Sequence, residues 1–239
     1  MNDPVYHFLI RLLHLFMWHG RLLGETNLPQ EGPGVFISNH LDSSGPIACL
    51  CSIPLRLYPW SVGDMLDLEK APAYMNMDFT ERELHLKPPL SNMVSYLLTR
   101  LTVPLLKGLG CIPACKRDYA RAQETLSLSM DVLRQGGFVL VFPKGQNLVE
   151  DKTTGIQPFE HTFARLGELY YGETGNQLPF FPVAVHPKGV VQVGKPERYN
   201  PTNKVGVERR RLKEMMEEAV RSMYKRLENE KPPPPLFTP

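Results

Sequence analysis

The residues that we consider first for acid–base chemistry lie around His40, in the stretch FISNHLDSSGP at positions 36–46. The apolar residues before Asn39 are typical of a buried strand, and Pro46 suits the first turn of a helix. A histidine between a strand and a helix indicates a general base, because its pKa lies near neutral pH. Such a base needs a carboxylate to orient its ring, and Asp42 stands two residues further along the chain.

Asp42 has two interpretations that the sequence leaves open. It can accept a hydrogen bond from His40 across the turn, because the flexible Ser-Ser-Gly segment at 43–45 allows the chain to bend back. It can instead cap the following turn or helix, as aspartate often does before serine and glycine. In the first case Asp42 belongs to a catalytic pair, and in the second it is local structure.

Two further groups of polar residues follow strand-like segments. Lys116 and Arg117 come directly after CIPAC, and Lys144 and Gly145 come directly after FVLVFP. A cationic side chain can pair with an anion, although lysine lacks the planar fork for a bidentate contact. The competing interpretation is that these side chains lie in solvent and bind nothing.

The elements that must position these residues alternate between strand and helix along the chain. Strands are predicted at 35–38, near the start of 55–64, and at 111–115, 138–143, 179–187 and 190–196, and helices at 46–53, 118–137, 160–171 and 207–229. Residues 90–110 predict two helices separated at Pro104, and residues 65–90 show no clear pattern. The alternation predicts a single α/β domain with a mixed, mostly parallel sheet flanked by helices.

The segment VYHFLIRLLHLFMW at 5–18 is the most hydrophobic predicted helix. With 14 residues it is too short to span a bilayer, which needs roughly 20. We interpret it as a membrane-associated helix at the interface, with a core helix under the sheet as the alternative. The predicted organisation is an interfacial helix at 1–22, an α/β domain at 23–206, an amphipathic helix at 207–230 and a proline-rich tail at 231–239.

Composition narrows the class of protein. The chain has 239 residues, and 42% of them are hydrophobic, which is enough for a substantial core. A net charge of +2 gives no sign of the concentrated basic face of a nucleic-acid-binding domain. No cleavable signal peptide is visible, so disulfides are not expected, and the spacings Cys49-x-Cys51 and Cys111-x3-Cys115 are unlike those of common zinc sites.

Four stretches in order resemble the glycerol-phosphate and lysophospholipid acyltransferase family, which includes the 1-acylglycerol-3-phosphate acyltransferases. They lie between about residues 20 and 200 and read LPQEGPGVFISNH, GLGCIPACKRDYARA, GGFVLVFPKGQN with QPFEHTFARLG, and FFPVAV with VGKP. In the family, the histidine of the first motif takes the proton of the acceptor hydroxyl, which then attacks the thioester of the acyl donor. The resemblance therefore implies that His40 is the general base and that Asn39 lies beside the substrate.

The chain departs from the family pattern in its first and third motifs. The family has an aspartate five residues after the histidine, and this chain has Gly45 there, which makes Asp42 a candidate substitute. The third motif of the family is Phe-Pro-Glu-Gly-Thr-Arg-Ser, and Lys144 stands in place of its glutamate, followed by Gly145. Lys144 is expected to bind the acceptor phosphate or to mark a different head group, unless the loop has lost its catalytic role.

The second motif, Gly-x-Ile-x-x-x-Arg in the family, places Lys116 at the phosphate-binding position, with Arg117 next to it. The fourth motif shapes the acyl pocket in the family, and His186 after it is interpreted as structural. The absence of a Gly-x-Ser-x-Gly motif disfavours a serine hydrolase.

The resemblance implies an O-acyltransferase of phospholipid biosynthesis. Such an enzyme moves a fatty acyl group from acyl-CoA or acyl carrier protein to a hydroxyl of a lysophospholipid or glycerolipid acceptor. It needs no cofactor beyond that co-substrate, and it works at a membrane surface on the cytoplasmic face. The alternative is a catalytically impaired relative that binds lipid or acyl groups, because both family carboxylates are replaced.

Overall fold

The computed structural model describes residues 3–16, 18, 20–41, 44–115, 118–143, 151 and 154–229. Contacts between Cα atoms group the chain into two compact units. We call Met1–Leu9 together with Tyr58–Ser129 the smaller unit, and Ile10–Leu57 together with Met130–Pro239 the larger unit.

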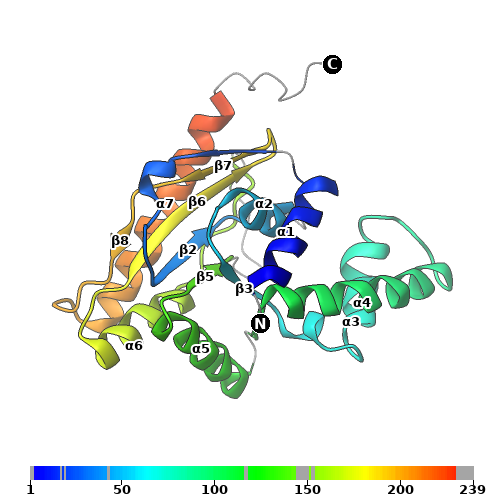
Figure 1. The fold of residues 1–239 in the computed structure, drawn as a ribbon, viewed down its shortest axis with the longest axis horizontal. Coiled ribbons are helices and arrows are strands. Elements are labelled where there is room, and N and C mark those ends of the chain that lie inside the picture. Colours follow the sequence, from blue (N-terminus) through cyan, green and yellow to red (C-terminus); the bar gives the residue numbers. More distant parts are fainter. Residues whose placement is uncertain are drawn as a thin grey trace. The chain divides into compact units, whose positions relative to one another are not determined.

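The larger unit is built on a sheet with β2 (Gly34–Ser38) inside it. β2 pairs in parallel with β5 (Phe138–Val141) on one side and with β6 (Pro179–His186) on the other. β6 also pairs antiparallel with β7 (Val190–Val193) and with the short β8 (Glu197–Arg198), and β1 (Arg21–Leu23) pairs in parallel with β7 (Figure 1). The sheet is mixed and mostly parallel, which confirms the predicted α/β class.

Continuous apolar runs place the central strands in the core of the larger unit. Val35, Phe36 and Ile37 of β2 are fully buried, and so are Val139 and Leu140 of β5. Strands that bury both faces need cover from helices, and this unit contains α2 (Ser44–Ser52), α6 (Arg165–Thr174) and α7 (Val205–Asn229). α7 packs on β6 and buries the apolar stripe that its sequence predicts, Leu212, Met216, Val220, Met223 and Leu227.

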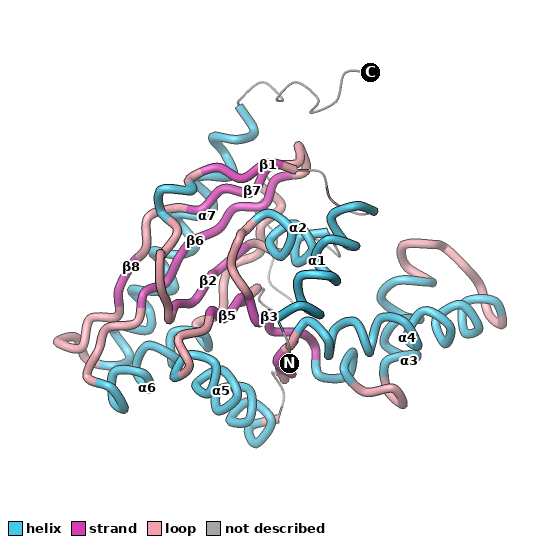
Figure 2. The backbone as a smooth tube through the Cα atoms, viewed as in Figure 1, coloured by secondary structure: helices cyan, strands magenta, loops and turns pink. Residues whose placement is uncertain are grey.

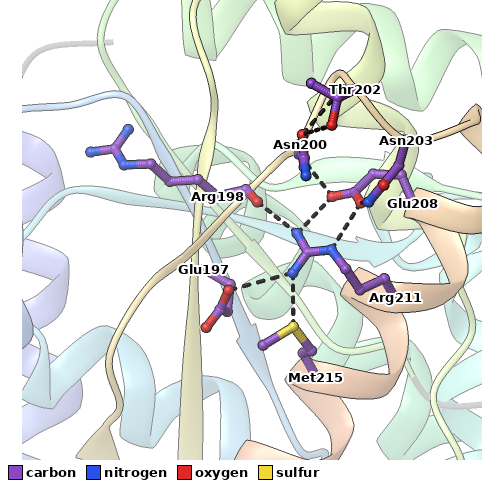
Figure 3. Close-up of polar contacts among 8 residues, drawn as sticks. All are labelled: Glu197, Arg198, Asn200, Thr202, Asn203, Glu208, Arg211 and Met215. Carbon is purple, nitrogen blue, oxygen red and sulfur yellow. Dashed lines mark hydrogen bonds and ion pairs between the residues drawn. The ribbon is translucent and has the colours of Figure 1, made fainter.

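A buried carboxylate fixes the start of α7 (Figure 3). Glu208 is fully buried, pairs with Arg211 at 2.7 Å, and accepts hydrogen bonds from Asn203 Nδ2 at 2.7 Å and the Asn200 backbone N–H at 2.8 Å. Burial opposes the ionisation of Glu208, but the hydrogen bonds from Arg211, Asn200 and Asn203 outweigh it and lower the pKa of Glu208. Because Arg211 also donates to the carbonyl of Arg198 at 2.8 Å, the network ties α7 to β8.

Helix α1 (Asp3–Phe16) covers most of the N-terminal segment that the sequence predicts as helical. It buries Tyr6 and Leu13, whereas Phe8, Leu12 and Leu15 are exposed. Over the ranges that the structure describes, we find no helix with both the length and the hydropathy that crossing a membrane requires.

The smaller unit contains most of β3 (Leu57–Val62), which pairs in parallel with β4 (Ile112–Ala114). Most of α5 (Tyr119–Arg134) also belongs to the smaller unit. Side-chain hydrogen bonds attach α5 to β3 and β4. The indole of Trp60 donates to Ser129 Oγ at 2.9 Å, and the hydroxyl of Thr125 donates to the Pro113 carbonyl at 2.6 Å. Figure 2 shows the helices and strands of the chain by class.

Residues 65–90, for which the sequence shows no clear pattern, form a 3-10 turn at Gly63–Leu66, the short helix α3 (Ala71–Met75) and a π-helical turn at Asn76–Thr80. The prediction of two helices separated at Pro104 is wrong, because α4 runs unbroken over Leu90–Leu109. A proline inside a helix costs about 3 kcal/mol. Buried side chains on both sides of Pro104, including Thr99 and Leu109, hold the helix together against that cost.

Candidate active site

His40 lies two residues beyond the carboxyl end of β2. β2 and β5 are parallel, and Ile37 is the partner of Val141, so the segments that leave the two strands meet at one edge of the sheet. The ring of the exposed His40 packs edge-on against Phe142, with ring centroids 5.4 Å apart and an interplanar angle of 71°. The structure therefore brings the first predicted motif next to the start of the third.

Asn39 holds the chain in place immediately before His40. Its side chain is buried, its Nδ2 donates to the Val185 carbonyl at 2.9 Å, and its Oδ1 accepts from the Val185 N–H at 2.8 Å. The amide thereby continues the pairing of β2 with β6 beyond the last backbone partner, Ser38. The contacts observed for Asn39 position the backbone of His40, and its predicted contact with substrate stays a prediction.

Gly45, where the sequence resemblance leads one to expect an aspartate, lies in the first turn of α2. Its N–H donates to the Leu41 carbonyl at 2.8 Å, and the Ser44 hydroxyl donates to the same carbonyl at 2.9 Å. A Cβ atom added to Gly45 would lie 3.5 Å from Leu41 Cβ and 3.6 Å from the Asn39 carbonyl oxygen, which are ordinary van der Waals distances. A Cβ atom at the buried position 45 would therefore meet no steric conflict with the atoms described around it.

Five of the predicted site residues, Asp42, Lys116, Arg117, Lys144 and Gly145, lie outside the described residues. The flanks of the second motif are described, and they belong to the smaller unit. Asp118 Oδ1 accepts hydrogen bonds from the N–H groups of Ala120 at 2.9 Å and Arg121 at 3.3 Å, so it caps α5. In the sequence, Lys116 and Arg117 fall between the last residue of β4 and the capping residue Asp118.

The chain that follows the third motif is anchored to α7 by residues that the sequence does not single out. Arg221 contacts Asp151 Oδ2 at 3.0 Å and Thr154 Oγ1 at 3.2 Å, and Glu217 accepts from the Phe159 N–H at 2.9 Å. Burial alone would raise the pKa of Glu217, but the hydrogen bonds from Phe159 and Lys213 lower it. The sequence hides this role because charged positions beside an apolar helical stripe normally lie in solvent.

His186 has the structural role that the sequence analysis expects. Its side chain is buried, its Nε2 lies 2.6 Å from Glu228 Oε2, and its Nδ1 accepts from the Lys188 N–H at 3.2 Å. The proton therefore resides on Nε2 and is donated to Glu228. Lys188 Nζ also donates to the carbonyls of Leu227 and Glu228, so this group fastens the end of α7 to the turn between β6 and β7.

Three of the four cysteines are poor nucleophiles, and no metal site is found among the described residues. All four are free thiols, and burial raises the pKa of Cys49 to about 12, of Cys51 to about 11 and of Cys111 to about 12. A thiol with such a pKa stays protonated at neutral pH and is a poor nucleophile. Where side chains are described, no group of three histidine, cysteine or acidic residues is placed to hold a metal ion.

No protein-family model and no curated protein matches this sequence. Among solved structures, the chain is similar to the 1-acyl-sn-glycerophosphate (LPA) acyltransferase PlsC from Thermotoga maritima. The TM-score is 0.56 at 14% sequence identity, over 96% of this chain and 80% of that chain. The two chains share a fold. At this identity the likeness shows a common fold and nothing more. The position of His40 just after β2 is observed in this chain itself and does not rest on the comparison.

Proposed function

We propose that this chain is an O-acyltransferase that moves a fatty acyl group from acyl-CoA or acyl carrier protein to a hydroxyl of a lysophospholipid or glycerolipid acceptor. The observation that carries the proposal is the exposed His40 at the carboxyl end of β2, beside Phe142, in a chain with the fold of an acyltransferase. In doubly wound sheets, this edge of the strands is where ligands bind.

The proposed reaction needs one base and one cation site. The His40 imidazole takes the proton of the acceptor hydroxyl while the oxygen attacks the thioester carbonyl. The tetrahedral intermediate then expels the thiolate of the acyl donor, which recovers the proton from the imidazolium. Lys116, Arg117 and Lys144 are the proposed partners of the acceptor phosphate, and Gly145 lets the backbone approach it.

The acceptor and the acyl product are membrane lipids, so we place the enzyme at the cytoplasmic face of a membrane. Helix α1 supports this placement, because Phe8, Leu12 and Leu15 are exposed along it. A helix with an apolar face of this kind can lie in the interface of a bilayer without crossing it.

The test is the release of free CoA from acyl-CoA in the presence of lysophosphatidic acid. We expect the wild type to release CoA and His40→Ala to stop the release, because the base is gone. His85→Asn is the matched control: His85 is exposed and has a φ of 53°, a conformation that asparagine also adopts.

The second candidate function is a protein that binds lipid or acyl groups without turnover. Gly45 favours it, because a Cβ atom fits at this position and yet the position carries no carboxylate. Saturable binding of acyl-CoA, with no CoA released across a panel of acceptors and both kinds of acyl donor, would establish this second function and overturn the first.

A further inference from the structure

Helix α4 of the smaller unit has its polarity reversed. Every fourth residue from Ser91 to Val103 is buried, and the exposed fractions of Ser91, Ser95 and Thr99 are 0%, 0% and 1%. An ordinary surface helix buries its apolar stripe and exposes its polar one. The inward stripe of α4 is instead made of small hydroxyl side chains until it reaches Val103.

Hydrogen bonds fix this orientation of α4. Ser95 Oγ lies 2.7 Å from Thr80 Oγ1, and the Ser95 hydroxyl also contacts the Ser91 carbonyl at 2.8 Å. Thr80 Oγ1 in turn donates to Asn76 Oδ1 at 2.9 Å, in the π-helical turn. A buried hydroxyl without a partner is costly, so the cluster resists any rotation of α4 that would turn its apolar side inward.

The outward face of α4 carries a stripe of large apolar side chains. Leu90, Met93, Leu97 and Leu101 are exposed at 47%, 57%, 59% and 72%. Their spacing of three or four residues puts them on one side of the helix, over a length of roughly 17 Å. Scattered apolar residues are normal on a surface, but a contiguous stripe indicates a surface that contacts something apolar.

Charge and side-chain type favour a lipid bilayer as that partner. Residues 90–109 contain Arg100 and Lys107 and no acidic residue, so the helix complements an anionic surface. Arg100 stacks on Tyr96, with its guanidinium carbon 4.8 Å from the ring centroid, and donates to the Tyr96 hydroxyl. Tyrosine and arginine are side chains that keep a polar end in water while their apolar part enters a membrane interface. A second copy of α4 would bring like charges together.

We propose that the stripe of Leu90, Met93, Leu97 and Leu101 docks α4 on the surface of an anionic bilayer, with the helix lying in the interface. Arg100 and Lys107 then reach the lipid phosphates from the flanks of the stripe. The stripe consists of other residues than the exposed apolar side chains of α1, and its docking goes beyond the proposed function, because docking on lipid requires no turnover.

The test is flotation of the full chain with vesicles of phosphatidylcholine and phosphatidylglycerol. We expect the double variant Leu97→Ser/Leu101→Ser to bind at least about tenfold more weakly than the wild type, because two apolar side chains no longer leave water. The double variant Val205→Ser/Val207→Ser is the matched control, since Val205 and Val207 are exposed apolar residues of α7. Circular dichroism verifies that each variant is folded.

Two further measurements locate the contact and identify the partner. We expect Leu101→Trp to gain fluorescence that brominated lipids quench, and Arg100→Gln/Lys107→Gln to weaken binding only where phosphatidylglycerol is present. Equal vesicle binding by the wild type and Leu97→Ser/Leu101→Ser overturns the proposal. A shift from dimer to monomer in that variant, with vesicle binding unchanged, also overturns it and assigns the stripe to a second copy of the chain.

Discussion

At the scale of single residues, the chemistry of His40 depends on which of its ring nitrogens carries the proton. An imidazole acts as a base only when its reacting nitrogen is unprotonated, and a neighbouring carboxylate usually selects that tautomer. Asn39 fixes the backbone of His40 through Val185 but offers no carboxylate. Position 45 is where the acyltransferase family that the sequence resembles carries that carboxylate, and a Cβ atom placed there meets no steric conflict with the atoms described around it.

We therefore expect Gly45→Asp to raise the rate of CoA release by about tenfold, well below the loss caused by removing a triad aspartate. The new carboxylate would orient the His40 ring and stabilise its imidazolium form. Gly45→Asn is the control, because it adds a side chain of the same shape without the charge. If Gly45→Asp and Gly45→Asn give the wild-type rate alike, the base of this chain does not depend on a carboxylate at position 45.

The place of His40 just beyond the end of a strand could be predicted, because His40 follows an apolar run directly in the sequence. The burial of Glu208 could not be predicted, because Glu208 begins the run ERRRLK, and the many charges of that run indicate a basic helix face exposed to solvent. Its burial results from Asn200, Asn203 and Arg211 converging on it from one turn and one helix. Such a convergence depends on how the chain folds back and leaves no periodic signal in the sequence.

At the scale of elements, the strands that carry the site are the ones that the sequence predicts best. β2, β5 and β6 are buried on both faces, so their continuous apolar runs distinguish them from their surroundings. β1 and β8, which the sequence analysis does not predict, have three and two residues, and pairing with β7 and β6 defines them. Segments that short carry no period from which a strand can be recognised.

The Glu208 network predicts how the anchoring of α7 responds to substitution. We expect Glu208→Gln to lower the free energy of unfolding by about 3 kcal/mol, because Arg211 loses its buried partner. The melting temperature should fall by roughly 10 °C. Glu218→Gln, at an exposed position of the same helix, serves as the control and should leave the melting temperature nearly unchanged.

The same network predicts the direction of a pH effect. The pKa of Glu208 is lower in the folded chain than in the unfolded chain, so its ionised form stabilises the fold above the unfolded pKa, near pH 4. That stabilisation is lost as the pH falls through the folded pKa. The difference in melting temperature between wild type and Glu208→Gln should therefore begin to narrow as the pH falls below about 4, and it should vanish only below the folded pKa of Glu208. A difference that stays constant from neutral pH to well below about pH 4 would contradict the role of Glu208 as an ionised partner.

At the scale of the whole molecule, the proposed base and the proposed docking stripe belong to different units of the chain, although Lys116 and Arg117, proposed to bind the acceptor phosphate, fall within the residue range of the smaller unit. His40 and Phe142 belong to the larger unit, whereas the apolar stripe of α4 belongs to the smaller unit. The order of the four motifs predicts one α/β fold from end to end, and the likeness to the acyltransferase covers nearly the whole chain. Residues 65–90 resist prediction because π-helical and 3-10 turns have no distinct sequence period.

If the α4 stripe serves only to bind lipid, substitutions in it should weaken the binding of the enzyme to membranes without changing the rate of the chemical step. With a short-chain lysophospholipid dissolved as monomers, Leu97→Ser/Leu101→Ser should release CoA within about twofold of the wild-type rate, since His40 and its surroundings are unchanged. With the acceptor embedded in anionic vesicles at low lipid concentration, the same variant should be at least about tenfold slower, because less enzyme is bound. At saturating lipid the two rates should converge, so the loss lies in KM and not in kcat. An equal loss with monomeric and vesicle-bound acceptor would instead mean that α4 supports the catalytic structure itself, since a docking surface has no part in a reaction that takes place in water.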